Sequence, residues 1–246
     1  MHDVRQWAVT TLAGLTCALV APLLGLIIAQ AFGLYDADEP VAAGFRCAVA
    51  QACLDPADGL DSHARESCAG EGRRVCIAPL GSISADLVRR LVDYYDETYG
   101  LEVGVLTPSS LPESIIDPDR QQIESKDIGF HISQMFPLDH DDPETVVIGL
   151  MPVDLYIEER NWRFAFGATW PDQFSLGIIS TVRMNPATFG LPNDDLYYDR
   201  VRTLVSKYIG LMYYDLPLSP DPMSPMYNNI LSVDDLDRMG DDLPIE

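Results

Sequence analysis

The stretch TLVSKYIGLMYYDLPLSPDPMSPMYN, residues 203–228, decides the fold that this sequence predicts. Its first part belongs to a long helix, which we expect to be capped by Asp194 or Asp195 and to end near Tyr213. Gly210 lies near the end of that helix, where a glycine lets the chain bend, and Met226 follows in a proline-rich turn. The helix, the glycine and the methionine turn form a core around which the other elements can be placed.

Upstream of this stretch the sequence alternates predicted strands and helices. Arg74 to Gly81 predicts a buried strand, and Ser84 to Tyr99 predicts an amphipathic helix that Ser84 caps and Gly100 ends. The remaining predictions are strands at 101–106, at 146–150 joined with 153–157, at 163–170 and at 174–183, an irregular loop at 107–122, and a short helix near 233–239. This order predicts an α/β or α+β fold with a mixed sheet.

The same region has the layout of a metzincin core, and more specifically it resembles the archaemetzincins, a family of small metzincin-type zinc peptidases. The resemblance rests on short motifs in a shared order: the opening strand 75–81, the run 153–156 followed by 161–167, and the turn Met226-Tyr227-Asn228. It covers roughly residues 73–239. It implies a metzincin-like mixed sheet, a long active-site helix and a methionine turn beneath a metal.

At the positions of the family's catalytic zinc site, the chain departs from the pattern. The first zinc histidine is replaced by Thr203, the catalytic glutamate by Leu204, the second histidine by Lys207 and the third by Tyr213, whereas Gly210 and Met226 are retained. A lysine ammonium has no lone pair for zinc and repels a dication, and a leucine cannot take a proton from water. We therefore predict no catalytic residue, no zinc and no other cofactor.

A second, cysteine-built zinc site of the family is also predicted to be absent, because no cysteine follows Cys76. Two histidines elsewhere offer a conceivable replacement site, formed by His131, His140 and Asp141, but we expect both to be surface histidines in a loop. A calcium site among Asp139, Asp141, Asp142 and Glu144 lacks the glycine and final glutamate of an EF-hand loop.

Four residues are candidates to line a retained cleft. These are Asp154, Lys207, Tyr213 and Tyr227. A cation in the place of a metal can pair with Asp154 or hold the carboxylate of a ligand, and the simpler alternative is that Lys207 has only a structural role. The tyrosines can equally be core and rim aromatics.

The N-terminal segment predicts delivery to a membrane. Residues 12–32 are uncharged and apolar, long enough to cross a hydrocarbon core of roughly 30 Å as a helix. Residues 1–35 are thus either a signal anchor or a signal peptide cut after Ala29-Gln30-Ala31, and the charges around them favour export of the rest. Residues 36–72 predict a linker with a disulfide-bonded subregion, and residues 73–246 the archaemetzincin-like domain.

Cysteine usage agrees with export. Cys47, Cys53, Cys68 and Cys76 lie close together without the spacing of a zinc motif, so two disulfides in any of three pairings are expected. The net charge of −22 makes nucleic-acid binding unlikely on electrostatic grounds. Lysine occurs only at Lys126 and Lys207.

These observations predict an exported or membrane-anchored pseudopeptidase that binds a peptide, a protein or an envelope component through its cleft. An active metallopeptidase with unrecognised metal ligands is the first alternative hypothesis. A purely structural envelope domain is the second.

Overall fold

The computed structural model describes residues 51–56, 68, 72–135, 145–170 and 175–245. All of them belong to the second of two units into which the chain divides, residues 41–246. The predicted membrane segment, Cys47, His140 and the acidic run around it lie outside these residues. Within the described ranges, no helix has the length and apolar character needed to cross a membrane.

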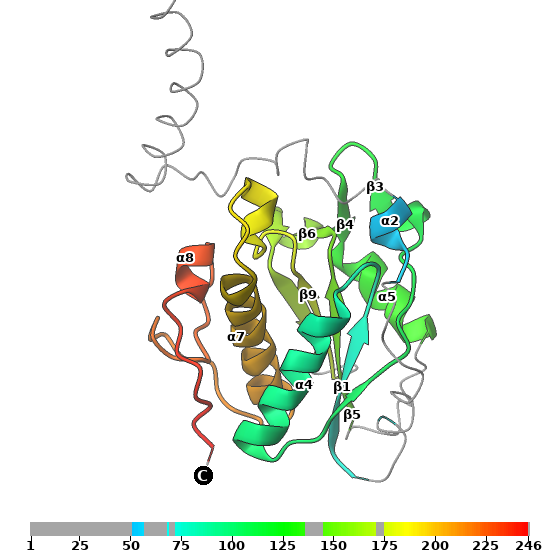
Figure 1. The fold of residues 1–246 in the computed structure, drawn as a ribbon. Coiled ribbons are helices and arrows are strands. Elements are labelled where there is room, and N and C mark those ends of the chain that lie inside the picture. Colours follow the sequence, from blue (N-terminus) through cyan, green and yellow to red (C-terminus); the bar gives the residue numbers. More distant parts are fainter. Residues whose placement is uncertain (1–50, 57–67, 69–71, 136–144, 171–174, 246) are drawn as a thin grey trace, which may run out of the picture. The chain divides into compact units, whose positions relative to one another are not determined.

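A five-stranded mixed sheet forms the centre of the second unit (Figure 1). Its strands, in the order in which they pair, are β2 (Val103–Val105), β1 (Arg74–Pro79), β5 (Thr145–Met151), β9 (Leu176–Ser180) and β8 (Gly167–Trp170). The first four run parallel, and β8 pairs antiparallel with β9 at the end of the sheet. The mixed sheet predicted from the sequence is confirmed.

A second, four-stranded sheet was not expected. It pairs β3 (Ile116–Asp117), β4 (Gln122–Glu124), β6 (Asp154–Ile157) and β7 (Trp162–Ala165) in that order. The prediction of one strand from 146 to 157 is therefore wrong, because the chain bends at Pro152 and passes from one sheet to the other. The predicted strand 163–170 divides in the same way at Phe166, and the expected loop 107–122 contains β3 and a short 3₁₀ helix, Glu113–Ile115.

The helices on either side of the predicted core agree well with the sequence. Helix α4 (Ala85–Tyr99) is capped by Ser84, and Gly100 ends it in the left-handed conformation, with φ +59°. Helix α7 (Asp194–Met212) is capped by Asn193, whose side chain accepts a hydrogen bond from the backbone of Leu196, instead of by Asp194 or Asp195. The two aspartates lie in the first turn, where the helix dipole favours negative charge. The predicted short helix is α8 (Val233–Leu236).

Helix α5 (Ser125–Met135) is a correction to the sequence analysis, which placed His131 in a loop. It packs through Ile128 and Ile132, both fully buried. Gly129 packs closely against Trp170, because a Cβ atom at that position would lie 3.1 Å from its ring. The remaining short helices are α2 (Gln51–Leu54) and the 3₁₀ turns Glu158–Arg160 and Pro186–Phe189.

Two hydrophobic layers cover the two faces of the main sheet. Side chains on one face, such as Val75 and Ile77 of β1, pack with α4 and α7, and those on the other, such as Cys76 and Ala78, pack with α5. Figure 1 shows the same arrangement, with α4 and α7 side by side on one face of the sheet. Burial on both faces explains why these parallel strands are continuously apolar.

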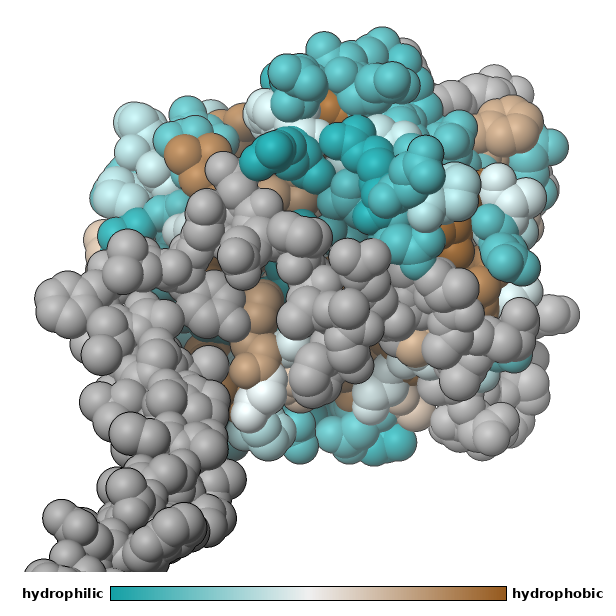
Figure 2. Space-filling model, turned by 90° about the horizontal axis from the view of Figure 1, so that it is seen from above, coloured by the Kyte–Doolittle hydropathy of each residue, from teal (hydrophilic) through white to brown (hydrophobic). Residues whose placement is uncertain are grey.

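A disulfide between Cys68 and Cys76 fastens the predicted linker to β1. Cys53 is disulfide-bonded as well, and its carbonyl oxygen accepts a hydrogen bond from the backbone of Ser82 at 3.0 Å. The expectation of disulfides in place of a zinc site is confirmed for these cysteines. The described part of the surface seen from above is mostly hydrophilic, with hydrophobic residues between (Figure 2), in line with the acidic composition.

Candidate functional site

The site begins with the way α7 lies on the sheet. Tyr208 is the contact residue: Cβ atoms at Gly167 of β8 and Gly177 of β9 would lie 2.3 Å from its Oη and 2.6 Å from its Cδ2. Glycine at both strand positions therefore lets the helix approach closely. Burial raises the pKa of the Tyr208 hydroxyl, which stays neutral. The close packing of Tyr208 determines which face of α7 contacts the sheet.

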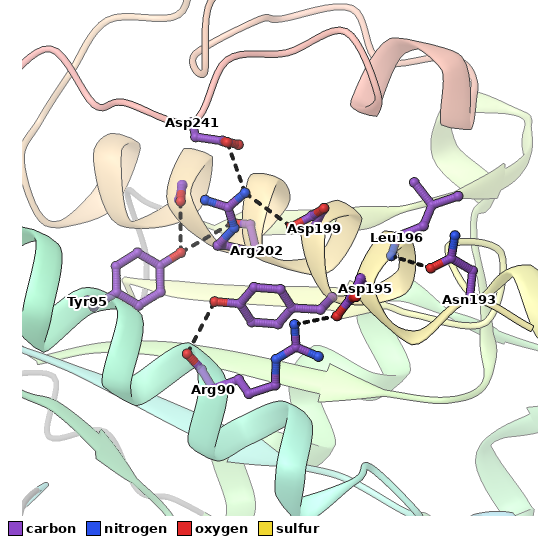
Figure 3. A network of polar contacts seen from close by, with 10 residues as sticks. Arg90, Tyr95, Asn193, Asp195, Leu196, Asp199, Arg202 and Asp241 are labelled. Carbon is purple, nitrogen blue, oxygen red and sulfur yellow. Dashed lines mark hydrogen bonds and ion pairs between the residues drawn. The ribbon is translucent and has the colours of Figure 1, made fainter.

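A second face of α7 is filled by contacts with α4 and the C-terminal segment (Figure 3). Tyr95 of α4 shares a hydrogen bond of 2.8 Å with Ser206 and donates another to the carbonyl oxygen of Arg202. The guanidinium of Arg202 pairs with Asp199 at 3.3 Å and with Asp241 at 2.9 Å. This network binds three parts of the chain together, so we assign it a structural role.

Lys207 lies on a different face of α7 from the one that contacts α4. Successive helical residues are turned by about 100°, so Lys207 faces away from both of its neighbours, Ser206 on the α4 side and Tyr208 on the sheet side. Helix α4 lies against β2, and α7 lies against β5 and β9. Lys207 therefore lies on the arc of α7 between Tyr208, which contacts Gly167 of β8, and Gly210, which packs against Met226.

The environment of Lys207 is unusual for a lysine. Its side chain is half-buried, and burial lowers the pKa of the ammonium group to about 8. No charged group contributes to that pKa shift, and within the described residues no ion pair or hydrogen bond engages the ammonium. The sequence suggested a pair with Asp154, but the structure gives Asp154 other partners.

Asp154, at the start of β6, is held by Arg183. The Arg183 guanidinium donates to both carboxylate oxygens, from Nε to Oδ1 at 2.9 Å and from Nη2 to Oδ2 at 2.7 Å. The side chain of Gln122 donates a further hydrogen bond of 2.8 Å to Oδ2. The sequence analysis missed Arg183, although an arginine that closes an apolar run was a signal that a buried counter-ion is needed.

The retained glycine and methionine lie against each other. A Cβ atom at Gly210 would lie 2.6 Å from the sulfur of Met226 and 3.0 Å from Leu243. Met226 is buried, and so are Thr203 and Leu204, which precede Gly210 on α7 by about two turns. Tyr227, the next residue of the turn, packs at the edge of the same core, and its backbone N–H donates to the carbonyl oxygen of Ser224.

Gly210 does not bend the helix, contrary to what the resemblance implied. Helix α7 continues to Met212, and the chain turns at Asp215, with φ +54°, where the backbone N–H of Leu216 donates to the carbonyl oxygen of Gly210. Tyr213 therefore directly follows the last residue of α7 and keeps a helical backbone conformation. Its ring lies under the guanidinium of Arg73 at 5.5 Å, and its hydroxyl donates to the carbonyl oxygen of that residue at 3.5 Å.

The four positions that correspond to the family's zinc site do not fit zinc. Thr203 and Leu204 are buried, Lys207 carries an ammonium group, and Tyr213 is engaged by Arg73. Neither leucine nor an ammonium group has a lone pair to give, and the tyrosine is turned to another face of the helix. Such a set of side chains is not a set of zinc ligands.

The conceivable histidine site is tested only in part. Burial lowers the pKa of His131, a hydrogen bond to the backbone of Ser110 acts in the opposite direction, and its Nε2 is buried without a partner. His140 and Asp141 lie outside the described residues. Among the residues that are described, no three His, Cys, Asp or Glu side chains come close enough together to hold a metal ion.

No family model matches the sequence, and no curated protein matches it. Three solved structures are similar to the structure of this chain. A zinc-dependent peptidase from Methanocorpusculum labreanum has a TM-score of 0.57 at 20% identity, covering 69% of this chain and 95% of the other. The archaemetzincin from Archaeoglobus fulgidus, complexed with malonate, has a TM-score of 0.53 at 24% identity, covering 69% and 94%.

The archaemetzincin from Methanopyrus kandleri has a TM-score of 0.55 at 22% identity and covers 76% of this chain and 93% of the other. Nearly the whole length of each solved chain is thus matched. At these identities the likeness concerns the fold, and it confirms the resemblance inferred from the sequence motifs: the chain has an archaemetzincin-like fold.

Proposed function

We propose that the chain is a pseudopeptidase that binds an extended peptide along the open edge of β8 without cleaving it. The observation that carries this proposal is the position of β8 at the end of the main sheet, with no described strand on its outer side. An open edge can pair with the backbone of an added strand, and the backbone hydrogen bonds supply affinity.

The hydrogen-bond phase of β8 defines which groups are available. The backbone N–H of Ser180 donates to the carbonyl oxygen of Phe166, its opposite residue across the β8–β9 pair. Hydrogen-bonded and non-bonded pairs alternate along an antiparallel ladder, so Ala168 and Trp170 also bond to β9. The N–H and C=O groups of Gly167 and Thr169 therefore face the open edge.

The edge also lacks the usual devices against pairing. Strand β8 contains no proline and no charge, and its residues Gly167, Ala168 and Thr169 are small. A peptide that pairs here lies beside α7, because Gly167 contacts Tyr208. Binding without cleavage follows from Leu204 and Lys207, which replace the groups that would activate water.

The binding half of the proposal is tested with two variants at one position. Thr169→Pro removes an N–H that β9 does not use, and we expect it to weaken binding of a library of short unstructured peptides by roughly tenfold or more. Thr169→Val keeps the N–H and should bind as the wild type does. Fluorescence anisotropy measures both, and circular dichroism verifies folding. Absence of binding to any peptide by the folded full chain would refute this half and favour a structural domain.

The same samples test inactivity. The peptides should remain intact by mass spectrometry after incubation with the full chain and excess zinc. Hydrolysis that a chelator abolishes would instead establish the alternative hypothesis of an active metallopeptidase.

We further propose that the chain acts at a membrane or outside the cytoplasm. The apolar segment 12–32 and the Cys68–Cys76 disulfide support this location, since structural disulfides persist in oxidising compartments. Alkylation of cell extracts before reduction should leave Cys68 and Cys76 unlabelled. Full labelling of both without reductant contradicts the proposal.

A further inference from the structure

We infer that Lys207 recognises a carboxylate of the peptide that pairs with β8. This inference rests on the proposed function and adds the chemistry of the ligand: a free C-terminal carboxylate or the side chain of an aspartate or glutamate. The juxtaposition that supports it is the open edge of β8 and a half-buried lysine on α7, next in sequence to Tyr208, which contacts Gly167 of β8.

Lys207 differs from the other cations of the described residues in its lack of both an acidic partner and full exposure to solvent. With 38 acidic and 16 basic residues, the protein offers acidic partners readily. The buried arginines use them: Arg183 pairs with Asp154 and Arg200 with Asp237, each at 2.7 Å. Cations without an ion pair in the described residues, such as Arg120 and Arg160, are exposed and solvated by water. Lys207 has neither an acidic partner among those residues nor full solvation.

A carboxylate bound at Lys207 supplies the counter-ion that the described part of the chain does not provide. A partly desolvated charge without a counter-ion is costly, and a ligand that brings the counter-ion recovers that cost as binding free energy. Charge-assisted hydrogen bonds are also shorter and stronger than neutral ones. Because an ammonium group acts as a point charge, it accepts a carboxylate from a terminus or from a side chain. A neutral peptide would cover the ammonium without compensating it.

The test compares peptides that differ in one carboxylate. The probes are N-acetylated peptides of serine and threonine in three forms: C-terminally amidated, with a free C-terminus, and amidated with one central glutamate. We expect at least one acidic form to bind the full chain about tenfold more tightly than the neutral form. The acidic form that binds more tightly shows whether Lys207 recognises a C-terminal carboxylate or a side-chain carboxylate.

Two lysine variants assign the preference. Lys207→Met keeps the length of the side chain and should remove the preference for a carboxylate. Lys126→Met is the matched control, because Lys126, the other lysine of the chain, is exposed and pairs with Glu159 at 2.6 Å. It should keep the preference. Circular dichroism of both variants confirms that they fold.

The outcomes separate the inference from the proposed function. Equal binding of acidic and neutral peptides by the wild type, or a preference that Lys207→Met retains, overturns the inference and leaves peptide binding in place. A carboxylate preference that persists in Thr169→Pro with unchanged affinity supports the lysine and overturns strand addition at β8.

Discussion

Replacing Asp154 with alanine is expected to lower the free energy of unfolding by about 3–5 kcal/mol. The carboxylate and the guanidinium of Arg183 form a bidentate pair in which the side chains are only 10% and 11% exposed. Removal of the carboxylate leaves the guanidinium buried without this counter-ion, and Gln122 loses an acceptor. Urea denaturation followed by circular dichroism measures the change.

An exposed pair provides the control for Asp154. Lys126 and Glu159 lie 2.6 Å apart, but their side chains are 57% and 68% exposed. Glu159→Ala should therefore leave the free energy of unfolding nearly unchanged, because solvent screens this pair. A similarly small effect of Asp154→Ala would contradict a stabilising buried pair. The double variant Asp154→Ala, Arg183→Met should recover part of the loss, since no buried charge then remains at the pair.

Replacing Lys207 with methionine is expected to raise the free energy of unfolding near pH 7 by about 1–3 kcal/mol. The pKa of the ammonium is about 8 in the folded chain against an ordinary value of 10.5. Below pH 8 the folded state therefore carries the full cost of a desolvated charge. Between pH 8 and 10.5 the unfolded chain binds the proton more readily, so the stability of the wild type rises with pH across this window.

The pH dependence distinguishes this effect from a general packing gain. The difference between Lys207→Met and the wild type should shrink as the pH rises from about 8 toward 10.5, as measured by urea denaturation at several pH values. The exposed Lys126, whose pKa is raised by its hydrogen bond to Glu159, should show no such gain when it is changed to methionine. A wild type that is the more stable form near pH 7 would contradict the expected cost of Lys207.

Local patterns predicted the elements that local interactions determine. Helix α4 has an apolar stripe, a serine cap and a glycine end, and all three are visible in the sequence. The strand β1 and the order of glycine and methionine in residues 203–228 were equally accessible. Helix α5 was missed because its glycine is accommodated by Trp170, a contact over a long sequence distance.

The sequence predicted which residues share a helix at the site, but it did not predict which side chains contact each other. The sequence located Thr203, Leu204 and Lys207 on one helix beside Gly210, and the structure packs Gly210 against Met226 as the motif order implied. The partner of Asp154 could not be predicted, because β6 and Arg183 meet only when the two sheets form. The end of α7 agrees with the predicted end near Tyr213, whereas the contact of Tyr213 with Arg73 could not be predicted from the sequence.

The Cys68–Cys76 disulfide has a mechanical consequence. A pull on the chain that arrives at Cys68 passes through the sulfur bridge to Cys76, and the residues between the two cysteines carry no load. Cys76 lies inside β1, which is hydrogen-bonded to β2 on one side and to β5 on the other. Tension at Cys68 is thus transmitted to β1, the strand next to the end of the sheet, where the ladders to β2 and β5 resist it together.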